Sequence, residues 1–265
     1  MDRIRVEREG AVGRVVLSRP EVRNAFDAEL ILRLRDAFLE LGKDSEVRLI
    51  CLSGEGKVFC GGADVNWMRA SLELTAEQNW EDAQRMAEMY RAVDECPKFV
   101  VGLVHGAAMG GGAGLVAACD YVVAASGTIL AFSEVKLGII PAVISSFVLP
   151  KIGAGPARFY FLTGATFDAA VARSLGLVQE IVDDWIPEEI DPVIRRLRDL
   201  VLAAGPHAVA EAKTLLRAVS RLGREEALRH CVDTIARIRT SSEAQEGLRA
   251  FLEKRKPAWS TSGPS

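Results

Sequence analysis

The sequence predicts an α/β protein in which strands alternate with helices up to about residue 150 and only helices follow. Three observations predict this class. Short β-branched runs alternate with longer segments whose apolar residues recur every three or four positions. Such alternation is typical of parallel βα units. Beyond residue 150 the patterns are helical, with a clear break at Gly205–Pro206.

The first elements are a strand hairpin and an amphipathic helix. The stretches "RIRVER" (3–8) and "VGRVVLS" (12–18) flank Glu9–Gly10, which predicts two paired strands. In "DAELILRLRDAFLELG", Asp27 is placed to cap the start of a helix and Gly42 suits its end. One face of this helix carries Leu30, Ile31, Leu34, Phe38 and Leu41.

Two further strands and two helices follow. "VRLICLS" (47–53) reads as a buried strand, and "TAEQ" (75–78) has the form of a capping box. The helix that it opens carries Trp80, Ala83, Ala87, Tyr90 and Val93, and Pro97 ends it. A strand over 98–104 leads through a run of glycines to a helix over about 111–118.

The C-terminal part differs from the rest because its sequence pattern is entirely helical. We expect a core over 1–195, a helical region over 196–258 and a short tail over 259–265. Within the helical region an apolar face is formed by Ala208, Val209, Ala212, Leu215, Leu216 and Val219. The periodicity leaves open whether this region packs on its own core or on a neighbouring subunit.

Composition excludes several classes of protein. The 265 residues are 49% hydrophobic and 26% charged, with a net charge of −3 and a pI near 5.8, so nothing suggests a nucleic-acid or anionic-membrane binder. The five cysteines form no CxxC pair, and three histidines offer no zinc-type cluster. The charged N-terminus is unlike a secretory signal, and no apolar run reaches about 20 residues. We expect a cytoplasmic protein with free thiols, no metal and no membrane span.

The stretch "AAMGGGAGLVAACD" (107–120) is the first candidate for a functional segment. Its glycines do not have the spacing of a phosphate-binding loop, and neither does "GEGKVF". They lie between a strand and a helix whose first amides are free donors, which suits an oxyanion that develops on a carbonyl group. Close packing of strand on helix explains the same glycines.

A second glycine turn and one glutamate complete the candidates. "FCGGAD" (59–64) opens a predicted helix with Asp64 as its N-cap, so two turns could each offer one N–H. In "AFSEVKLGIIPA", Glu134 lies among apolar residues, which predicts either a raised pKa suited to acid/base catalysis or an ordinary salt-bridged group. His105, Cys60 and Cys119 read as packing residues.

Together these segments resemble the crotonase superfamily, the enoyl-CoA hydratases and isomerases. The resemblance covers residues 13 to 255 and is carried by "RPEVRNAFDAEL", "FCGGADVNWM", "VHGAAMGGGAGLVAACD", "FSEVKLGIIPA", "LTGATFDAAVARSLGLVQEIV" and "FLEKRK". It implies a spiral of ββα turns that binds an acyl-CoA thioester, and a C-terminal helical region that forms trimers, often paired as hexamers. Coenzyme A is then part of the substrate, and no separate cofactor is expected.

The resemblance also implies roles for individual residues. Glu134 corresponds to the catalytic acid/base, and the N–H groups of Ala63 and Gly111 correspond to the oxyanion hole. The implied contacts to coenzyme A and substrate are Arg23, Ala25, Ala63, Asp64, Val65, Asn66, Gly111, Phe251 and Lys254, the last two commonly reaching a neighbouring subunit. Trp67, Met68 and Trp80 would line the acyl pocket.

The sequence departs from the family pattern at Gly114. Hydratases of this family commonly carry a second glutamate three residues after the oxyanion glycine, and that position is Gly114 here. Glu134 alone could hydrate a 2-enoyl-CoA, and "NWM" with "SEVKLGIIPAVIS" resembles the branch that hydrates methylglutaconyl-CoA in leucine breakdown. Glu134 alone could equally move a double bond, as in a Δ3-Δ2 enoyl-CoA isomerase.

A role of another class stays open beside these two. Some members of the methylglutaconyl-CoA hydratase group bind RNA, and a member could serve as a scaffold. The net charge of −3 argues against RNA, and the two intact glycine turns argue against a scaffold without activity.

Overall fold

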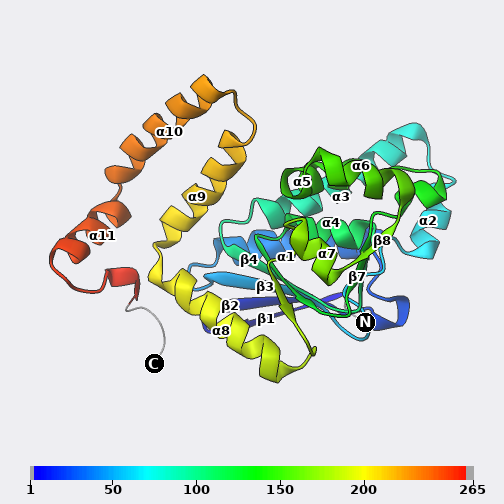
Figure 1. The fold of residues 1–265 in the computed structure, drawn as a ribbon, viewed down its shortest axis with the longest axis horizontal. Helices are drawn as coiled ribbons and strands as arrows, with labels where there is room; N and C mark the ends of the chain where they lie inside the picture. Colours follow the sequence, from blue (N-terminus) through cyan, green and yellow to red (C-terminus); the bar gives the residue numbers. More distant parts are fainter. Residues whose placement is uncertain (1–2, 261–265) are drawn as a thin grey trace.

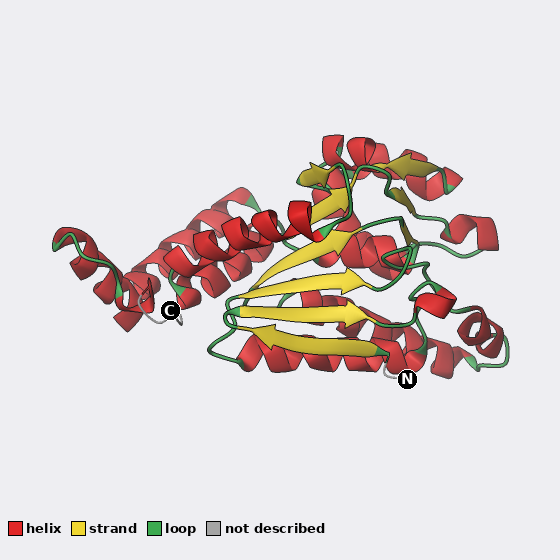
Figure 2. Cartoon of the chain, turned by 90° about the horizontal axis from the view of Figure 1, so that it is seen from below, coloured by secondary structure: helices red, strands yellow, loops and turns green. Residues whose placement is uncertain are grey.

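A computed structural model describes residues 3–260, and a six-stranded sheet lies at its centre (Figures 1 and 2). In spatial order the strands are β1 (Ile4–Glu9), β2 (Val12–Leu17), β3 (Leu49–Gly54), β4 (Phe99–Val104), β6 (Tyr121–Ala125) and β9 (Glu180–Val182). β1 is antiparallel to β2, and every later neighbouring pair is parallel. The predicted hairpin and the predicted parallel units are confirmed.

A second sheet has three short strands and carries the glycine segment. Its order is β5 (Ala107–Met109), β7 (Ile129–Ala131) and β8 (Thr166–Asp168), with β5–β7 parallel and β7–β8 antiparallel. The Gly110 N–H donates to the Ala131 carbonyl at 2.8 Å, so the chain leaves β5 still fixed to this sheet. The helix that starts at the next residue therefore has a fixed origin.

Eleven α-helices and three short 3-10 turns lie within the described residues. The α-helices are α1 (Ala28–Lys43), α2 (Val65–Ser71), α3 (Ala76–Asp94), α4 (Gly111–Ala118), α5 (Ala142–Ile152), α6 (Ala154–Thr163), α7 (Ala169–Ser174), α8 (Pro187–Ala203), α9 (Pro206–Val219), α10 (Arg224–Arg239) and α11 (Ser242–Leu252). The 3-10 turns are η1 (Pro20–Val22), η2 (Glu134–Leu137) and η3 (Ala258–Ser260).

Helices bury both faces of the large sheet. On one face, residues of α1, α3 and α4 form the main apolar cluster with inward-pointing side chains of the strands. On the other, Ile190, Val193 and Leu197 of α8 pack with Leu49 and Val101. Because both faces are covered, β3 and β4 read as continuous apolar runs rather than alternating ones.

The predicted helix starts are confirmed at atomic detail. The Asp27 carboxylate accepts the Leu30 N–H at 2.8 Å, and both bonds of the Thr75–Gln78 capping box are present. These caps satisfy amides that have no partner inside the helix. At the other end of α1, Gly42 lies inside the last turn, since the helix runs on to Lys43.

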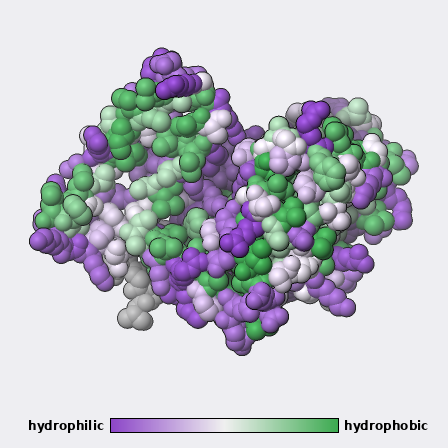
Figure 3. Space-filling model, in the orientation of Figure 1, coloured by the Kyte–Doolittle hydropathy of each residue, from purple (hydrophilic) through white to green (hydrophobic). Residues whose placement is uncertain are grey.

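Helices α9, α10 and α11, which we call the arm, extend away from the sheet (Figure 1). One tie to the core is Lys213 on α9, whose Nζ lies 2.6 Å from the Asp120 carboxylate and donates to the Lys98 carbonyl at 3.0 Å. Hydrophobic side chains gather on the visible surface of the arm (Figure 3). The exposed large ones on the arm are Leu216, Val219, Leu228, Val232, Ile235, Leu248, Phe251 and Leu252.

The boundary expected at residue 195 lies inside α8. Because α8 is packed on the sheet, the division between core and arm comes at Gly205–Pro206, which the sequence had shown as a break. Of the predicted tail, Trp259 is placed: its Nε1–H donates to the Ala203 carbonyl at 3.3 Å. Residues 261–265 of that tail lie outside the described residues.

Candidate active site

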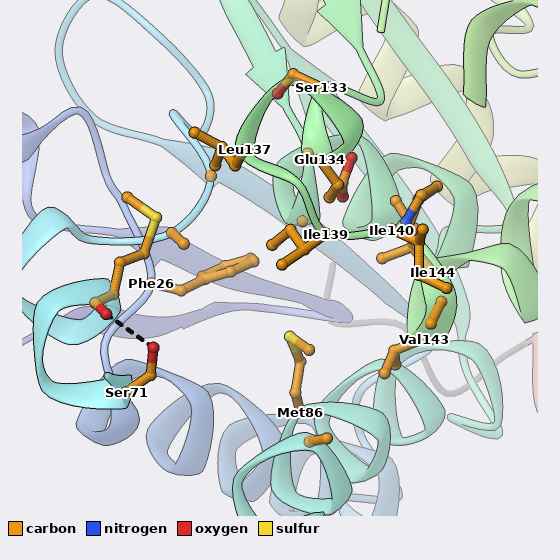
Figure 4. Close-up of a pocket in the computed structure, with 18 of the residues that line it drawn as sticks. Phe26, Ser71, Met86, Ser133, Glu134, Leu137, Ile139, Ile140, Val143 and Ile144 are labelled. Carbon is orange, nitrogen blue, oxygen red and sulfur yellow. Dashed lines mark hydrogen bonds between the residues drawn. The ribbon is translucent and has the colours of Figure 1, made fainter. Parts of the chain in front are cut away.

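A cavity of about 450 Å³ lies where the two glycine turns meet α2, α3 and the start of α5 (Figure 4). Its volume falls within the range usual for small-molecule sites. The predicted site residues that line it are Ala63, Trp67, Met68, Gly111 and Glu134. Sequence reasoning did not name most of the others, among them Phe26, Ser71, Asn79, Asp82, Met86, Ile139, Ile140, Val143 and Ile144.

The first glycine turn is held by the side chain of Asn24. Asn24 is fully buried, and its Nδ2 donates to the carbonyls of Val58 and Phe59 at 2.9 and 3.2 Å. Phe26 then pairs with the turn, donating to the Gly62 carbonyl at 2.7 Å and accepting the Asp64 N–H at 2.8 Å. These two bonds involve the residues on either side of Ala63. The Ala63 N–H itself has no hydrogen-bond partner among the described residues, and Ala63 lines the cavity.

Arg19 fixes the same turn through ion pairs and a hydrogen bond. Its guanidinium lies 2.8 Å from the Asp64 carboxylate and 3.0 Å from that of Asp27, and it donates to the Ala25 carbonyl at 2.7 Å. Burial raises the pKa of Asp64, but the Asn66 N–H and Arg19 lower it more, so its pKa lies below the usual value. Asp64 is the predicted N-cap of α2, confirmed by its 2.8 Å bond from the Asn66 N–H.

Close packing accounts for glycines of the second turn, since a Cβ on Gly111 would lie 2.7 Å from Cε2 of Phe26, and the role of the Gly111 N–H in an oxyanion hole stays a prediction. A Cβ on Gly112 would lie 2.7 Å from the Cys60 carbonyl oxygen, so this glycine permits close packing. Gly111 is the first residue of α4, where an N–H has no partner within the helix, and it lines the cavity. Tyr90 donates its hydroxyl to the Gly111 carbonyl at 2.8 Å and thereby fixes this end of α4.

The structure leaves no room for a side chain at Gly114. A Cβ there would lie 3.0 Å from the Cβ of Ile144, closer still to its Cγ2, and 3.1 Å from Cε1 of Tyr90. Both neighbours belong to the packed core: Ile144 is 3% exposed and Tyr90 is fully buried. The position of the second family glutamate is therefore filled by Ile144 and Tyr90.

Glu134 brings a carboxylate into the cavity beside the glycine turn. It begins η2, and its Oε1 would lie 3.4 Å from a Cβ on Gly110. Its Oε2 is buried and has no hydrogen-bond partner among the described residues. Burial raises the pKa of Glu134 above its ordinary value, and a hydrogen bond to its own backbone N–H offsets only part of that rise. Of the two alternatives that the sequence left open, burial with a raised pKa is the one that agrees with the structure, since Glu134 forms no salt bridge with the described residues.

A second carboxylate, that of Asp82, lines the cavity from α3. Asn79, Asp82, Ala83 and Met86 are three or four positions apart and so share one face of the helix. Trp80 is 67% exposed and is not among the residues that line the cavity, where we had expected it. In Figure 4, Met86 and Glu134 lie on opposite sides of the cavity.

The remaining predicted binding residues do not line the cavity. Arg23, Ala25, Asp64, Val65 and Asn66 belong to the loop and helix start that surround Ala63. Phe251 and Lys254 lie at the end of α11, at the far side of the arm from the cavity elements (Figure 1). Phe251 is 80% exposed.

Comparisons with known proteins settle the family. The sequence profile described as Enoyl-CoA hydratase/isomerase matches residues 7–262. The chain belongs to this family. It is therefore a member of the crotonase superfamily that the motifs indicated, and its α/β fold is the fold of the solved relatives.

The individual relatives include proteins named as hydratases and one named as an isomerase. A provisionally named enoyl-CoA hydratase of Thermus thermophilus is 35% identical over 254 residues, covering 96% of this chain and 99% of that protein. The crystal structure of an enoyl-CoA hydratase from Shewanella pealeana is 37% identical, with a TM-score of 0.92 over 97% of this chain and 96% of that one. A peroxisomal Δ3,5-Δ2,4-dienoyl-CoA isomerase of Arabidopsis thaliana is 28% identical, covering 96% of this chain and 94% of that protein.

Residues 3–260 contain neither a metal-type cluster nor a membrane-spanning helix. No group of three or more His, Cys, Asp or Glu side chains there could hold a metal ion. In the same part of the chain, no helix is both long enough and apolar enough to cross a membrane.

Proposed function

We propose that this family member is an enoyl-CoA hydratase that adds water to a 2-enoyl-CoA. The observation that carries the proposal is one cavity lined by Ala63, Gly111 and the half-buried Glu134, where the two N–H groups of Ala63 and Gly111 have no hydrogen-bond partner within residues 3–260. Fixed N–H donors stabilise the oxygen of an enolate, and removing one such donor typically costs about 10²–10³ in rate.

One carboxylate is enough to balance the reaction. Glu134 accepts a proton from water as the water oxygen bonds to C3 of the substrate, and the electron pair moves onto the thioester oxygen. Glu134 then returns the proton to C2 as the enolate collapses. The Oε2 atom, which has no other partner among the described residues, is suited to this exchange. Its raised pKa brings the carboxylate nearer to the operating pH, where proton transfer is most efficient.

Binding of the coenzyme A portion is proposed at the loop beside Ala63. Arg23, Ala25 and the backbone of residues 64–66 lie there, while the Asp64 side chain is already occupied by Arg19. Phe251 and Lys254 would take part from the arm of a neighbouring copy, in a trimer or a pair of trimers. Five free cysteines support the cytosol as the location of the enzyme.

Isomerisation of a 3-enoyl-CoA is the second candidate. The observation that favours it is the filled space at Gly114, since moving a proton between C4 and C2 needs only one carboxylate. Both candidates use the same enolate and the same two N–H groups. They differ in whether the cavity admits a water molecule to C3.

Direct assays separate the two. We expect hydration of trans-2-hexenoyl-CoA, measured as loss of the conjugated thioester absorbance, and slower conversion of 3-hexenoyl-CoA. Glu134→Gln should lower kcat by about 10²–10⁴, whereas Glu40→Gln, an exposed glutamate on α1, should leave it unchanged. Isomerisation without hydration would reverse the order of the candidates, and full activity of Glu134→Gln would reject both.

A further inference from the structure

The charges that line the cavity are of one sign. Among the described lining residues there is no lysine, arginine or histidine, while Asp82 and Glu134 are both carboxylic acids. A substrate whose acyl group ended in a carboxylate would therefore bring a third acid into this cavity with no cation to pair with it. Unpaired charges in partly dehydrated sites are costly.

One guanidinium, that of Arg85, lies near the Asp82 carboxyl group. The Asp82 side chain is 15% exposed, and a guanidinium nitrogen of Arg85 lies 3.6 Å away. Arg85 is not part of the lining, and it also faces Glu81, at 3.7 Å. This surface of α3 thus carries two carboxylates and one guanidinium, so its local balance is negative.

Most of the remaining lining is apolar, and its polar side chains, Ser71, Asn79 and Ser133, are uncharged. Trp67, Met68 and Met86 face the cavity from α2 and α3, and Val143 and Ile144 face it from α5. Ile139 and Ile140 line it as well, yet they are 57% and 70% exposed in the empty cavity. An apolar ligand would remove this surface from water, and each buried methylene typically strengthens binding about fourfold.

We propose that the acyl group taken by this cavity is uncharged and apolar, and that Asp82 is a specificity-determining residue that rejects acyl groups ending in a carboxylate. The thioester itself rests on the proposed function, but the preference follows from the lining alone. Asp82 lies four positions before Met86, on the same face of α3, and Met86 lies across the cavity from Glu134 (Figure 4), so we place Asp82 on the acyl side of the cavity. A substrate of the methylglutaconyl type is then disfavoured, in contrast to what the local resemblance implied.

A matched pair of substrates tests the preference. trans-2-Pentenoyl-CoA and glutaconyl-CoA have the same five carbons and the same double bond, and differ in a terminal methyl or carboxylate. We expect the wild type to hydrate the pentenoyl ester with at least about tenfold higher kcat/KM. Equal or faster hydration of glutaconyl-CoA would overturn the proposal.

Substitution of Asp82 tests its role. Asp82→Asn keeps the shape and removes the charge, and should reduce the preference on the order of fivefold. Glu40→Gln removes an exposed charge from α1, outside the lining and not paired with Arg85, and should leave the preference as it is. An unchanged preference in Asp82→Asn would overturn the role of Asp82. So would a fall of more than about 100-fold on 2-pentenoyl-CoA, which would identify Asp82 as a second catalytic acid.

Binding of saturated esters separates this proposal from the proposed function. Valeryl-CoA and glutaryl-CoA cannot be hydrated, and calorimetry gives their dissociation constants directly. Tighter binding of valeryl-CoA, with a smaller difference in Asp82→Asn, would support the preference even for a protein that hydrates nothing. Equal binding, or tighter binding of glutaryl-CoA, would overturn it even for an active hydratase.

Discussion

The core and the arm use helices of similar amphipathic pattern in opposite ways. Helix α1 in the core buries six side chains against the sheet and α3. In the arm, α9 and α10 bury none and α11 buries only Ala250. Helices with the same apolar periodicity therefore bury their apolar face in the core and leave it exposed in the arm.

This difference shows what periodicity can and cannot specify. An apolar stripe indicates that one face of a helix is suited to burial. Which element packs on that face depends on the chain connection and on tertiary packing. The core helices find such an element within the chain because short loops return them to the sheet. The arm extends beyond Gly205–Pro206, and its apolar face meets no other part of residues 3–260 that would bury it.

The largest predicted effect concerns the buried ion pairs of Arg19. Arg19→Met leaves the buried carboxylate of Asp64 without its cation, whereas Asp27 keeps Arg3 at 2.9 Å, so we expect a loss of about 3–5 kcal/mol in the free energy of unfolding from Asp64. In the arm, Arg255→Met removes an exposed pair with Glu246 and should change stability little. Urea unfolding of both variants checks this, and equal losses would remove the contrast between the regions.

The next effect compares one substitution at two glycines. Gly114→Ser forces a side chain against Ile144 and Tyr90, and overpacking of this kind costs about 1–3 kcal/mol. Gly223→Ser in the arm places a good N-cap at the start of α10, where a Cβ meets nothing within 4 Å, and should be neutral or slightly stabilising.

Thermal and urea unfolding of the two serine variants give the comparison. Pairing Gly114→Ser with Ile144→Ala tests the cause, since the shortened side chain makes room for the hydroxymethyl group. If the double variant is no better than the sum of the two single losses, Ile144 is not the obstacle.

A third prediction addresses what covers the arm. The trimer that the family resemblance implies stays a prediction, and Leu228 and Val232, one turn apart and both exposed on α10, are suited to test it. Replacing both by Asp should convert the assembly to single chains in sedimentation velocity while leaving the core folded. A wild type that already sediments as a single chain would contradict the expectation.

The smallest effect lies in the site itself. Burial raises the pKa of Glu134 in the folded chain, so the folded state binds this proton more tightly than the unfolded state does. Stability is therefore lost as pH rises from the ordinary glutamate pKa through the raised one. Glu134→Gln should raise the unfolding midpoint at pH 8, and the gain should vanish towards pH 4. A gain independent of pH would assign the effect to packing.

Local features of the site could be predicted from the sequence, and long-range ones could not. The caps at Asp27 and Thr75, the glycine turns and the burial of Glu134 each depend on neighbours within a few positions. Arg19 joins Asp64 across 45 residues, a contact that no local pattern indicates. The resemblance stretch "RPEVRNAFDAEL" begins with Arg19 and contains Asn24, but the burial of these two residues appears only in the fold.

The part of the cavity lined by α3 was also not predictable from the sequence. Trp80 and Asp82 are two positions apart on α3, and the sequence favoured the aromatic residue for the pocket. The docking of α3 on the core decides which face meets the cavity, and it selects Asp82. At Gly114 the sequence showed that a carboxylate was missing, but only the structure shows that Ile144 fills the space.

The cysteine thiols differ between the core and the arm in the same way as the helices do: they are buried in the core and partly exposed in the arm. Cys51, Cys60, Cys96 and Cys119 are buried in the core, and burial raises the pKa of Cys51, Cys60 and Cys119 to about 12, so these sulfurs stay protonated and unreactive towards alkylating reagents. Cys231 is partly exposed on α10. A maleimide added to the native protein would therefore label the arm at one place, and slower labelling at higher protein concentration would report a second chain over Cys231.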